Sequence, residues 1–146
     1  MQIYKKILPL ESNAQIDFLD ITQDVRGIIR ESNIRQGQVL VFVPHTTMGV
    51  AINHNEPLLL QDFMRVLYKS APMDDRYSHD LFELRKERIS DGRSNGHSHC
   101  KALLIGSSET IPVERGDMIL SPIQSIFVIE FDGARKRDVI VQVIGV

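Results

Sequence analysis

Three of the five histidines lie where the chain is expected to change direction. His45 follows an apolar run, and His97 and His99 precede another at 102–105. Histidine carries protons near neutral pH and is the commonest metal ligand in proteins. A His-x-His pair places both rings on one face only in an extended segment, because a helix points them about 200° apart. These histidines indicate a proton-transfer or metal site, and a hydrogen-bonded structural role is the alternative for each.

A carboxylate inside an apolar strand is the second chemical feature. Glu130 follows the apolar residues 126–129 and shares a strand face with every second one of them. A buried carboxylate is costly unless it is paired, protonated or bound to a cation. Two interpretations stay open: Glu130 serves the histidine site, or it pairs with Arg135 or Arg137 across the turn at 132–133.

Hydroxyl and amide side chains accompany the first histidine. Thr46 and Thr47 follow His45, and Asn53 and Glu56 precede a predicted helix. Free N–H groups at the start of a helix, together with nearby hydroxyls, suit an anion. This region is therefore a candidate anion-binding site.

The first half of the chain predicts alternating strands and helices that would position these residues. A strand is expected at 15–21, and a helix capped by Thr22 ends before Gln36. The run at 38–43 is apolar on both faces, which is typical of a central strand covered on each side. A strand at 48–53 precedes a helix that begins with Asn55 as its capping residue and ends near Lys69, with one apolar core stripe.

The second half of the chain begins with a long polar segment. The sequence LRKER within residues 71–96 is typical of a solvated face. A helix is expected at 97–105, which would separate His97 from His99. Strands are expected at 110–113, 118–120, 125–132 and 138–144, the last two as a hairpin. Two or three helices among about seven strands, without a βαβ rhythm, favour the α+β class.

Composition excludes several classes of protein. Seventeen Lys and Arg residues against nineteen Asp and Glu leave a net charge of −2, with no basic block. Nucleic acid and membrane surfaces are therefore not expected partners. Cys100 is the single cysteine, which excludes internal disulfides, and no apolar run approaches the length of a membrane span. We expect one folded domain over residues 1–146 and a cytoplasmic location.

Three separated blocks carry a resemblance to a known family. They are PHTTMGVAINHNE, SNGHSHCKALLIGSSETIPVERGD and QSIFVIEFDGARKRDVIVQVIG. They resemble the YjbQ family, also called secondary thiamine-phosphate synthase, over nearly the whole chain. The resemblance implies a sandwich-like α+β fold, a homotrimer and a pocket built from the histidine-bearing segments. Where the family typically has Gly-x-Trp-Gln, this chain has Ser121-Pro122-Ile123-Gln124.

Site residues follow from matching positions in the family motifs. His45 lies in a His-Thr-Thr/Ser segment, His99 in a His-x-Lys/Arg-Ala segment, and Glu130 in the strand before Asp-Gly. The resemblance implies that these three form the catalytic group. With His97 they would also form a site for a divalent metal ion, zinc or magnesium. The residues expected to bind substrate are Thr46, Thr47, Asn53, Lys101 and Gln124, with Lys101 meeting a phosphate.

The resemblance implies weak thiamine-phosphate synthase activity on small-molecule substrates. In that reaction a thiazole phosphate displaces pyrophosphate from an aminopyrimidine methyl diphosphate, which requires neutralisation of the leaving group. Two alternatives are a metal-dependent hydrolase of a small substrate and a non-catalytic ligand-binding trimer.

Overall fold

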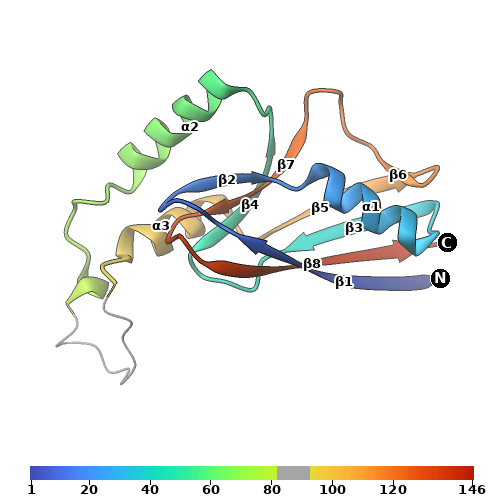
Figure 1. Ribbon diagram of the computed structural model, residues 1–146, viewed down its shortest axis with the longest axis horizontal. Helices are drawn as coiled ribbons and strands as arrows, with labels where there is room; N and C mark the ends of the chain where they lie inside the picture. Colours follow the sequence, from blue (N-terminus) through green and yellow to red (C-terminus); the bar gives the residue numbers. More distant parts are fainter. Residues whose placement is uncertain (82–92) are drawn as a thin grey trace.

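Two antiparallel sheets and three α-helices form the described part of the chain in this computed structural model, which describes residues 1–81 and 93–146 (Figure 1). The larger sheet has the strand order β1 (Gln2–Glu11), β8 (Lys136–Gly145), β3 (Gln36–Phe42), β5 (Ser108–Glu114) and β6 (Asp117–Met118). The smaller sheet has the order β2 (Asp17–Asp20), β7 (Ser125–Glu130) and β4 (Met48–Asn53). The helices are α1 (Thr22–Ser32), α2 (Pro57–Ser70) and α3 (Gly96–Ile105), with a 3₁₀ turn, η1 (Ser78–Asp80). The predicted α+β class with a sandwich-like sheet core is confirmed.

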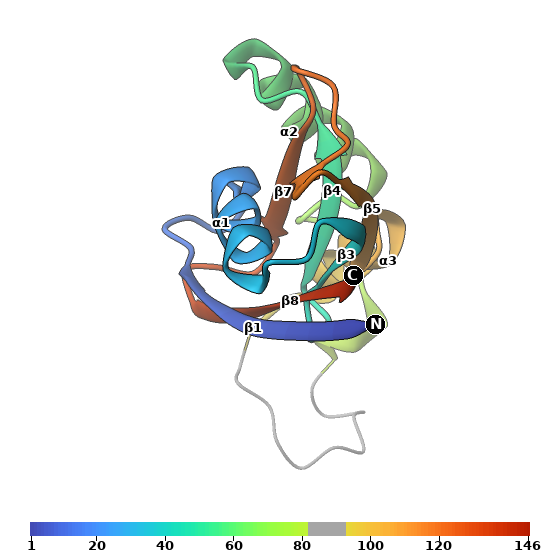
Figure 2. The same cartoon turned by 90° about the vertical axis from the view of Figure 1, so that its right-hand side faces the viewer.

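The main core lies between the two sheets and α1 (Figure 2). Alternate residues of β3 and β8 point inward and are fully buried, among them Val39, Val41 and Val141. Val25 and Ile29 of α1 pack into the same cluster. A second cluster on the other face of the smaller sheet is built around Phe127, Ile129 and Phe131. β7 is therefore buried on both faces, which matches its continuous apolar sequence.

β3 is covered on one face only, which corrects the prediction of a strand covered on both sides. Val39 and Val41 are buried, whereas Leu40 and Phe42 on the opposite face are partly exposed. Helix α1 and the smaller sheet occupy the inner side of the larger sheet. No described helix packs on its other side.

The predicted hairpin at the end of the chain is wrong. β7 pairs with β2 and β4, whereas β8 pairs with β1 and β3, so residues 131–135 cross from one sheet to the other. The crossing segment finds hydrogen bonds elsewhere: the Phe131 N–H donates to the Thr47 carbonyl, and the Ser12 N–H donates to the Arg135 carbonyl. These bonds replace the ladder that a hairpin would supply.

Helix α1 begins one residue earlier than predicted. Ile21 is the N-cap and Thr22 is the first helical residue. The Thr22 hydroxyl donates to Asp20 and accepts from the Ile126 N–H, 2.9 Å away. Thr22 therefore joins the helix to β7 and does not cap it.

The cap of α2 is Glu56 and not the predicted Asn55. Its carboxylate accepts hydrogen bonds from the N–H groups of Leu58 at 3.1 Å and Leu59 at 2.7 Å. The Asn55 amide donates instead to Asp20. Pro57 at the first helical position matches the prediction.

Replacing Glu56 by alanine removes both cap hydrogen bonds of α2. We expect a loss of about 1 kcal/mol of unfolding free energy, the usual cost of a lost cap. Chemical denaturation measures it, with exposed Gln61→Ala in the same helix as the control. A loss no larger than that of the control would show that the cap contributes nothing.

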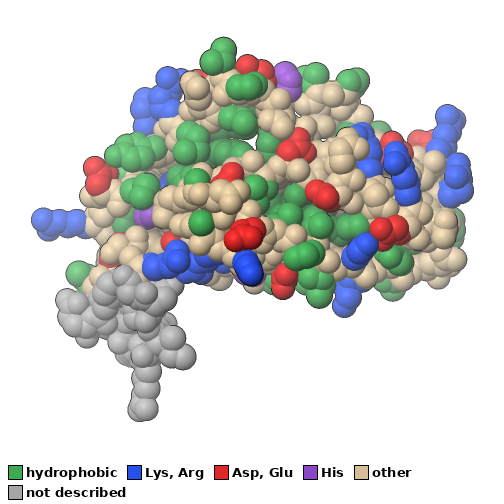
Figure 3. Space-filling model, viewed as in Figure 1, with side chains coloured by type: hydrophobic (Ala, Val, Ile, Leu, Met, Phe, Trp, Pro, Cys, Tyr) green, Lys and Arg blue, Asp and Glu red, His purple; other side chains and the backbone are tan. Residues whose placement is uncertain are grey.

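Helix α2 stands off from the sheets in both views (Figures 1 and 2). Leu67 is its one fully buried side chain, and Leu60 packs partly against the second cluster. Met64 and Val66 remain exposed, and apolar side chains gather over the helix in Figure 3. The predicted core stripe is thus only partly buried in the single chain.

Helix α3 is confirmed at nearly its predicted bounds. The LRKER sequence lies outside the described residues. In the described ranges no helix is long and apolar enough to cross a membrane.

Candidate functional site

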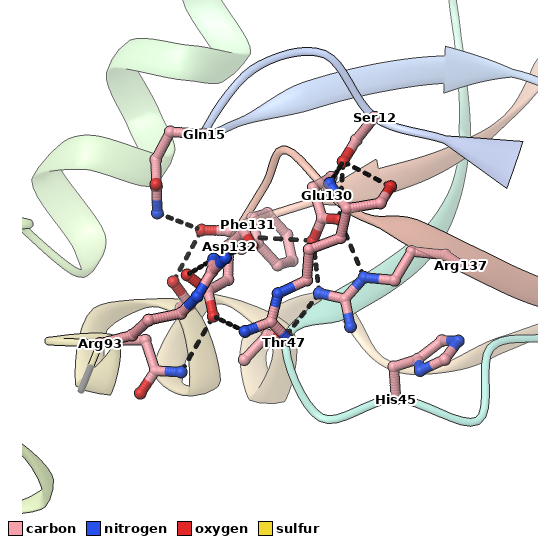
Figure 4. Close-up of polar contacts among 12 residues, drawn as sticks. Ser12, Gln15, His45, Thr47, Arg93, Glu130, Phe131, Asp132 and Arg137 are labelled. Carbon is pink, nitrogen blue, oxygen red and sulfur yellow. Dashed lines mark hydrogen bonds and ion pairs between the residues drawn. The ribbon is translucent and has the colours of Figure 1, made fainter. Parts of the chain in front are cut away.

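Glu130 forms a buried ion pair with Arg137, one of the two interpretations that the sequence left open. Arg137 Nη2 lies 2.6 Å from Glu130 Oε2, and Nε lies 2.9 Å from Oε1 (Figure 4). Ser12 donates to Oε1 at 2.9 Å, and the Asp132 N–H donates to Oε2 at 3.2 Å. Arg137 Nη2 also donates to Thr47 Oγ1 at 2.7 Å. Ser12, Thr47, Glu130 and Arg137 are called the Glu130 cluster below.

The Glu130 carboxylate stays charged inside the protein. Burial by itself would raise its pKa, but the hydrogen bonds from Arg137, Asp132 and Ser12 outweigh burial and leave the pKa below its ordinary value. Both oxygens accept two hydrogen bonds each, so the carboxylate has little capacity left for a metal ion.

A second carboxylate in the crossing segment extends the cluster. Asp132 is 4% exposed and lies 3.2 Å from Arg93 Nη1 and 3.2 Å from Arg135 Nη2. The Asn95 amide, at the start of α3, donates to Asp132 at 3.0 Å. Together with the Glu130 pair, three guanidinium groups face two carboxylates.

The alternation of side chains along β7 and β8 explains why Glu130 and Arg137 meet. Glu130 ends the inward-facing row of β7, and Arg137 begins the inward-facing row of β8 that continues with Val139 and Val141. Sequence reasoning began the last strand at Asp138 and thus missed Arg137 as a buried residue. Extending the period-two pattern backwards by one step would have found it. Ser12 had no such signal, because β1 was not predicted.

His45 lies beside Arg137 at the edge of an open hollow of about 490 Å³. Its Nε2 lies 3.0 Å from the Asp138 carbonyl, which can accept its proton. Arg137 Nη1 has no partner among the described residues and turns toward the side on which His45 lies (Figure 4). Lys136 lines the same hollow. An imidazole, a fixed guanidinium and an ammonium thus share one opening, which Glu11 and Asp138 also line.

His97 and Lys101 are enclosed and do not face this hollow. Lys101 Nζ lies 2.7 Å from His97 Nδ1 and donates to the Ala71 carbonyl at 2.7 Å. Burial lowers the pKa of His97, and the neighbouring ammonium lowers it further. Burial also lowers the pKa of Lys101. Because Lys101 is fully buried, it cannot meet a substrate phosphate in the single chain, contrary to the predicted role.

His99 points away from the buried His97 and is partly exposed, as the helix prediction required. Its ring lies against the ring of His79 in η1, with 4.7 Å between centroids and an interplanar angle of 72°. Within the described residues, no three His, Cys, Asp or Glu side chains are grouped to hold a metal ion. One chain therefore does not gather His45, His97, His99 and Glu130 into the expected metal site.

The predicted substrate-binding residues divide between two ends of the smaller sheet. Thr47 belongs to the Glu130 cluster, whereas the neighbouring Thr46 is exposed. Asn53 and Gln124 line a separate hollow of about 380 Å³ at the far end of β4. Five residue steps of an extended strand place these ends about 17 Å apart. In the part of the chain that the structure describes, Thr47 and Asn53 therefore do not share one hollow.

Residues 6–146 match the family described as UPF0047 protein YjbQ-like. The chain belongs to this family. Its membership, predicted from the three sequence blocks, is confirmed. A UPF0047 protein from Methanothermobacter thermautotrophicus is 38% identical over 145 residues, which cover 99% of this chain and 94% of the relative. The UPF0047 protein YugU of Bacillus subtilis is 32% identical over 141 residues, which cover 96% and 98%.

Solved structures of family members share the fold of this YjbQ-like chain. A YbjQ-like protein of unknown function from Sulfolobus solfataricus P2 matches with a TM-score of 0.90 at 27% identity, over 99% of both chains. A protein of the yjbq/upf0047 family from Clostridium acetobutylicum matches with a TM-score of 0.84 at 36% identity, over 95% of this chain and 99% of that one.

Proposed function

We propose that this chain is an enzyme that binds the phosphate or diphosphate group of a small substrate in the hollow beside His45. The reaction that we propose is the joining of a thiazole phosphate to an aminopyrimidine methyl diphosphate, as in thiamine-phosphate synthesis. The observation that carries the proposal is the guanidinium of Arg137, a residue that lines this hollow and that Glu130 and Thr47 hold in place.

A guanidinium held in one orientation is suited to binding an anionic leaving group. Glu130 and Thr47 hold Arg137 in one orientation, so little conformational entropy is lost when it binds an oxyanion. Lys136 adds a second cation at the rim. Such prearranged charge stabilises a transition state in which negative charge accumulates on a departing group.

The proposed step breaks one bond and forms another. The thiazole nitrogen forms a C–N bond to the methylene carbon, and the C–O bond to diphosphate breaks, with the electron pair leaving on pyrophosphate. Arg137 Nη1 would bind the oxygens of that leaving group. His45 Nδ1, which has no partner among the described residues, would give it a proton.

The proposal is tested by substitutions at His45 and Arg137. We expect His45→Gln to lower kcat/KM for thiamine-phosphate formation about 100-fold, the usual effect of removing a general acid. We expect Arg137→Lys to lower it by a similar factor, because an ammonium cannot keep both partners and still reach the leaving group. The measurement is product formation from the two purified precursors.

A matched control and a folding check accompany these variants. Arg65 is an exposed arginine on α2, and Arg65→Gln should leave turnover unchanged. Thermal melts show whether Arg137→Lys folds, and His45→Gln tests the site without breaking the ion pair. Full turnover by His45→Gln, or none by the natural protein, would refute the proposal. The predicted divalent metal is tested separately by metal analysis of the purified protein.

A further inference from the structure

The hollow beside His45 presents charged groups of both signs. Arg137 and Lys136 line it as cations. Glu11 and Asp138 line it as well. The register of β1 and β8 produces this mixture, because Glu11 lies opposite Lys136 and Asp138 comes two residues later on the same face of β8. Phosphate binding employs the two cations and gives the two carboxylates no part.

These carboxylates are available to a ligand. Glu11, Lys136 and Asp138 are exposed. Among the described residues, none of their side chains forms an ion pair or a hydrogen bond. Asp138 contacts His45 through its backbone alone. The carboxylate oxygens therefore keep their full capacity to accept hydrogen bonds.

The charge balance of the hollow disfavours a ligand that is only an anion. Arg137 is 7% exposed and Glu130 already balances its charge, so one ammonium faces two carboxylates. Inorganic pyrophosphate would gain from the cations but would also meet two like charges that it cannot satisfy. A ligand with N–H donors beside its phosphate group would satisfy both, because a carboxylate accepts hydrogen bonds and a guanidinium donates them.

We infer that the hollow selects a phosphate ester that also carries an amino group, and that Glu11 and Asp138 bind this amino group. This assignment rests on the proposed function, which puts the phosphate beside Arg137 and Lys136. The aminopyrimidine methyl diphosphate of the proposed reaction has both features. Its exocyclic amino group offers two N–H donors to the carboxylates, and its diphosphate brings the negative charge that the cations bind.

The remaining wall of the hollow suits a small planar ring. Pro9 and Leu10 supply apolar surface there, and the volume of about 490 Å³ is within the range of small-molecule sites. Pro9 lies directly opposite Asp138 in the register of β1 and β8. Side chains opposite each other in an antiparallel pair are neighbours, so a ring that lies against Pro9 would bring its amino group to the Asp138 carboxylate.

Isothermal titration calorimetry with two matched ligands tests this selectivity. One is the aminopyrimidine methyl diphosphate, and the other is its analogue with hydrogen in place of the amino group, which leaves the diphosphate unchanged. We expect the natural protein to bind the first about 10-fold more tightly, the usual effect of one lost hydrogen bond to a charged group. The double variant Glu11→Ala with Asp138→Ala should lose this preference. It should also bind inorganic pyrophosphate about 5-fold more tightly, because the like charges are gone.

A matched variant and a chelator serve as controls. Glu114→Ala removes an exposed carboxylate at the opposite end of the larger sheet and should leave both affinities unchanged. Thermal melts verify that each variant folds. The titrations are made with EDTA and repeated with Mg²⁺, and a preference seen only with Mg²⁺ would assign the carboxylates to a metal ion and overturn the inference. Equal affinity of the natural protein for the two ligands would overturn it too, as would an unchanged preference in the double variant.

Binding and turnover distinguish the selectivity from the proposed reaction. Selective binding of the amino ligand without product formation would support the selectivity and refute the reaction. Product formation with equal binding of the two ligands would refute the selectivity alone. Binding of neither ligand would refute both.

Discussion

Replacing Glu130 by alanine is expected to lower the free energy of unfolding by about 3–5 kcal/mol, because it leaves the buried Arg137 guanidinium without its counter-charge. Glu130 is 0% exposed and the Arg137 side chain is 6% exposed, so water cannot replace the lost carboxylate. Ser12 Oγ and the Asp132 N–H lose their acceptor as well. Urea denaturation followed by circular dichroism measures the loss.

Two further variants separate the ion pair from a general effect of substitution. Lys6→Ala breaks the exposed pair between Lys6 and Glu31 and should change stability little. Combining Glu130→Ala with Arg137→Met removes both charges and should recover part of the loss, since an uncompensated charge no longer remains. If Glu130→Ala were no worse than Lys6→Ala, the cluster would have no structural role.

Lowering the pH is expected to destabilise the protein in two separate windows. The pKa of His97 is lowered in the folded state, so the unfolded chain takes up this proton first, and stability falls as the pH drops below about 6.5. The pKa of Glu130 is also lowered, so its contribution is lost as the pH falls below 4.5 and through the folded-state pKa. Within each window, uptake of one proton by the unfolded chain lowers the free energy of unfolding by about 1.4 kcal/mol for each pH unit that the pH falls.

At alkaline pH, the titration of Lys101 also makes the free energy of unfolding increase with pH. Its pKa is lowered in the folded state, so stability rises with pH between the folded-state pKa and 10.5. Unfolding free energies should therefore rise from pH 4 to about pH 6.5, and rise again where the pH passes the folded-state pKa of Lys101.

The variant His97→Gln isolates the upper window of the acid effect. A glutamine does not titrate, so the fall in stability below pH 6.5 should shrink, whereas the fall below pH 4.5 should remain. An unchanged slope near pH 6 in His97→Gln would show that another group is responsible. His54 is only partly buried, and His54→Gln serves as the matched control.

Several features were predictable because they depend on local sequence. The helical period separated His97 from His99, and the structure places one ring against Lys101 and the other against His79. Strand alternation put Glu130 on the inner face of β7. Proline and an acidic residue marked the start of α2. In each case the pattern of a few neighbouring residues determines which way a side chain points.

The failed predictions concern contacts between distant segments. The Asp-Gly turn suggested a hairpin, but the two strands join different sheets. Lys101 looked like a phosphate ligand, but α3 turns it into the protein toward the Ala71 carbonyl. A turn signal or a side-chain charge carries no information about which remote segment will pack against it.

The sequence by itself determined the α+β class and most strand and helix positions, because these follow from hydrophobic periodicity. It also determined the family, from three sequence blocks, and showed that the Glu130 carboxylate needs a partner. Only the tertiary structure decided that Arg137 is that partner and that it lines the hollow beside His45. It also decided that one sheet face stays open. The physical reason is that β7 and β8 meet through the core and not through the turn between them, and pairing at a distance depends on the packing of the whole chain.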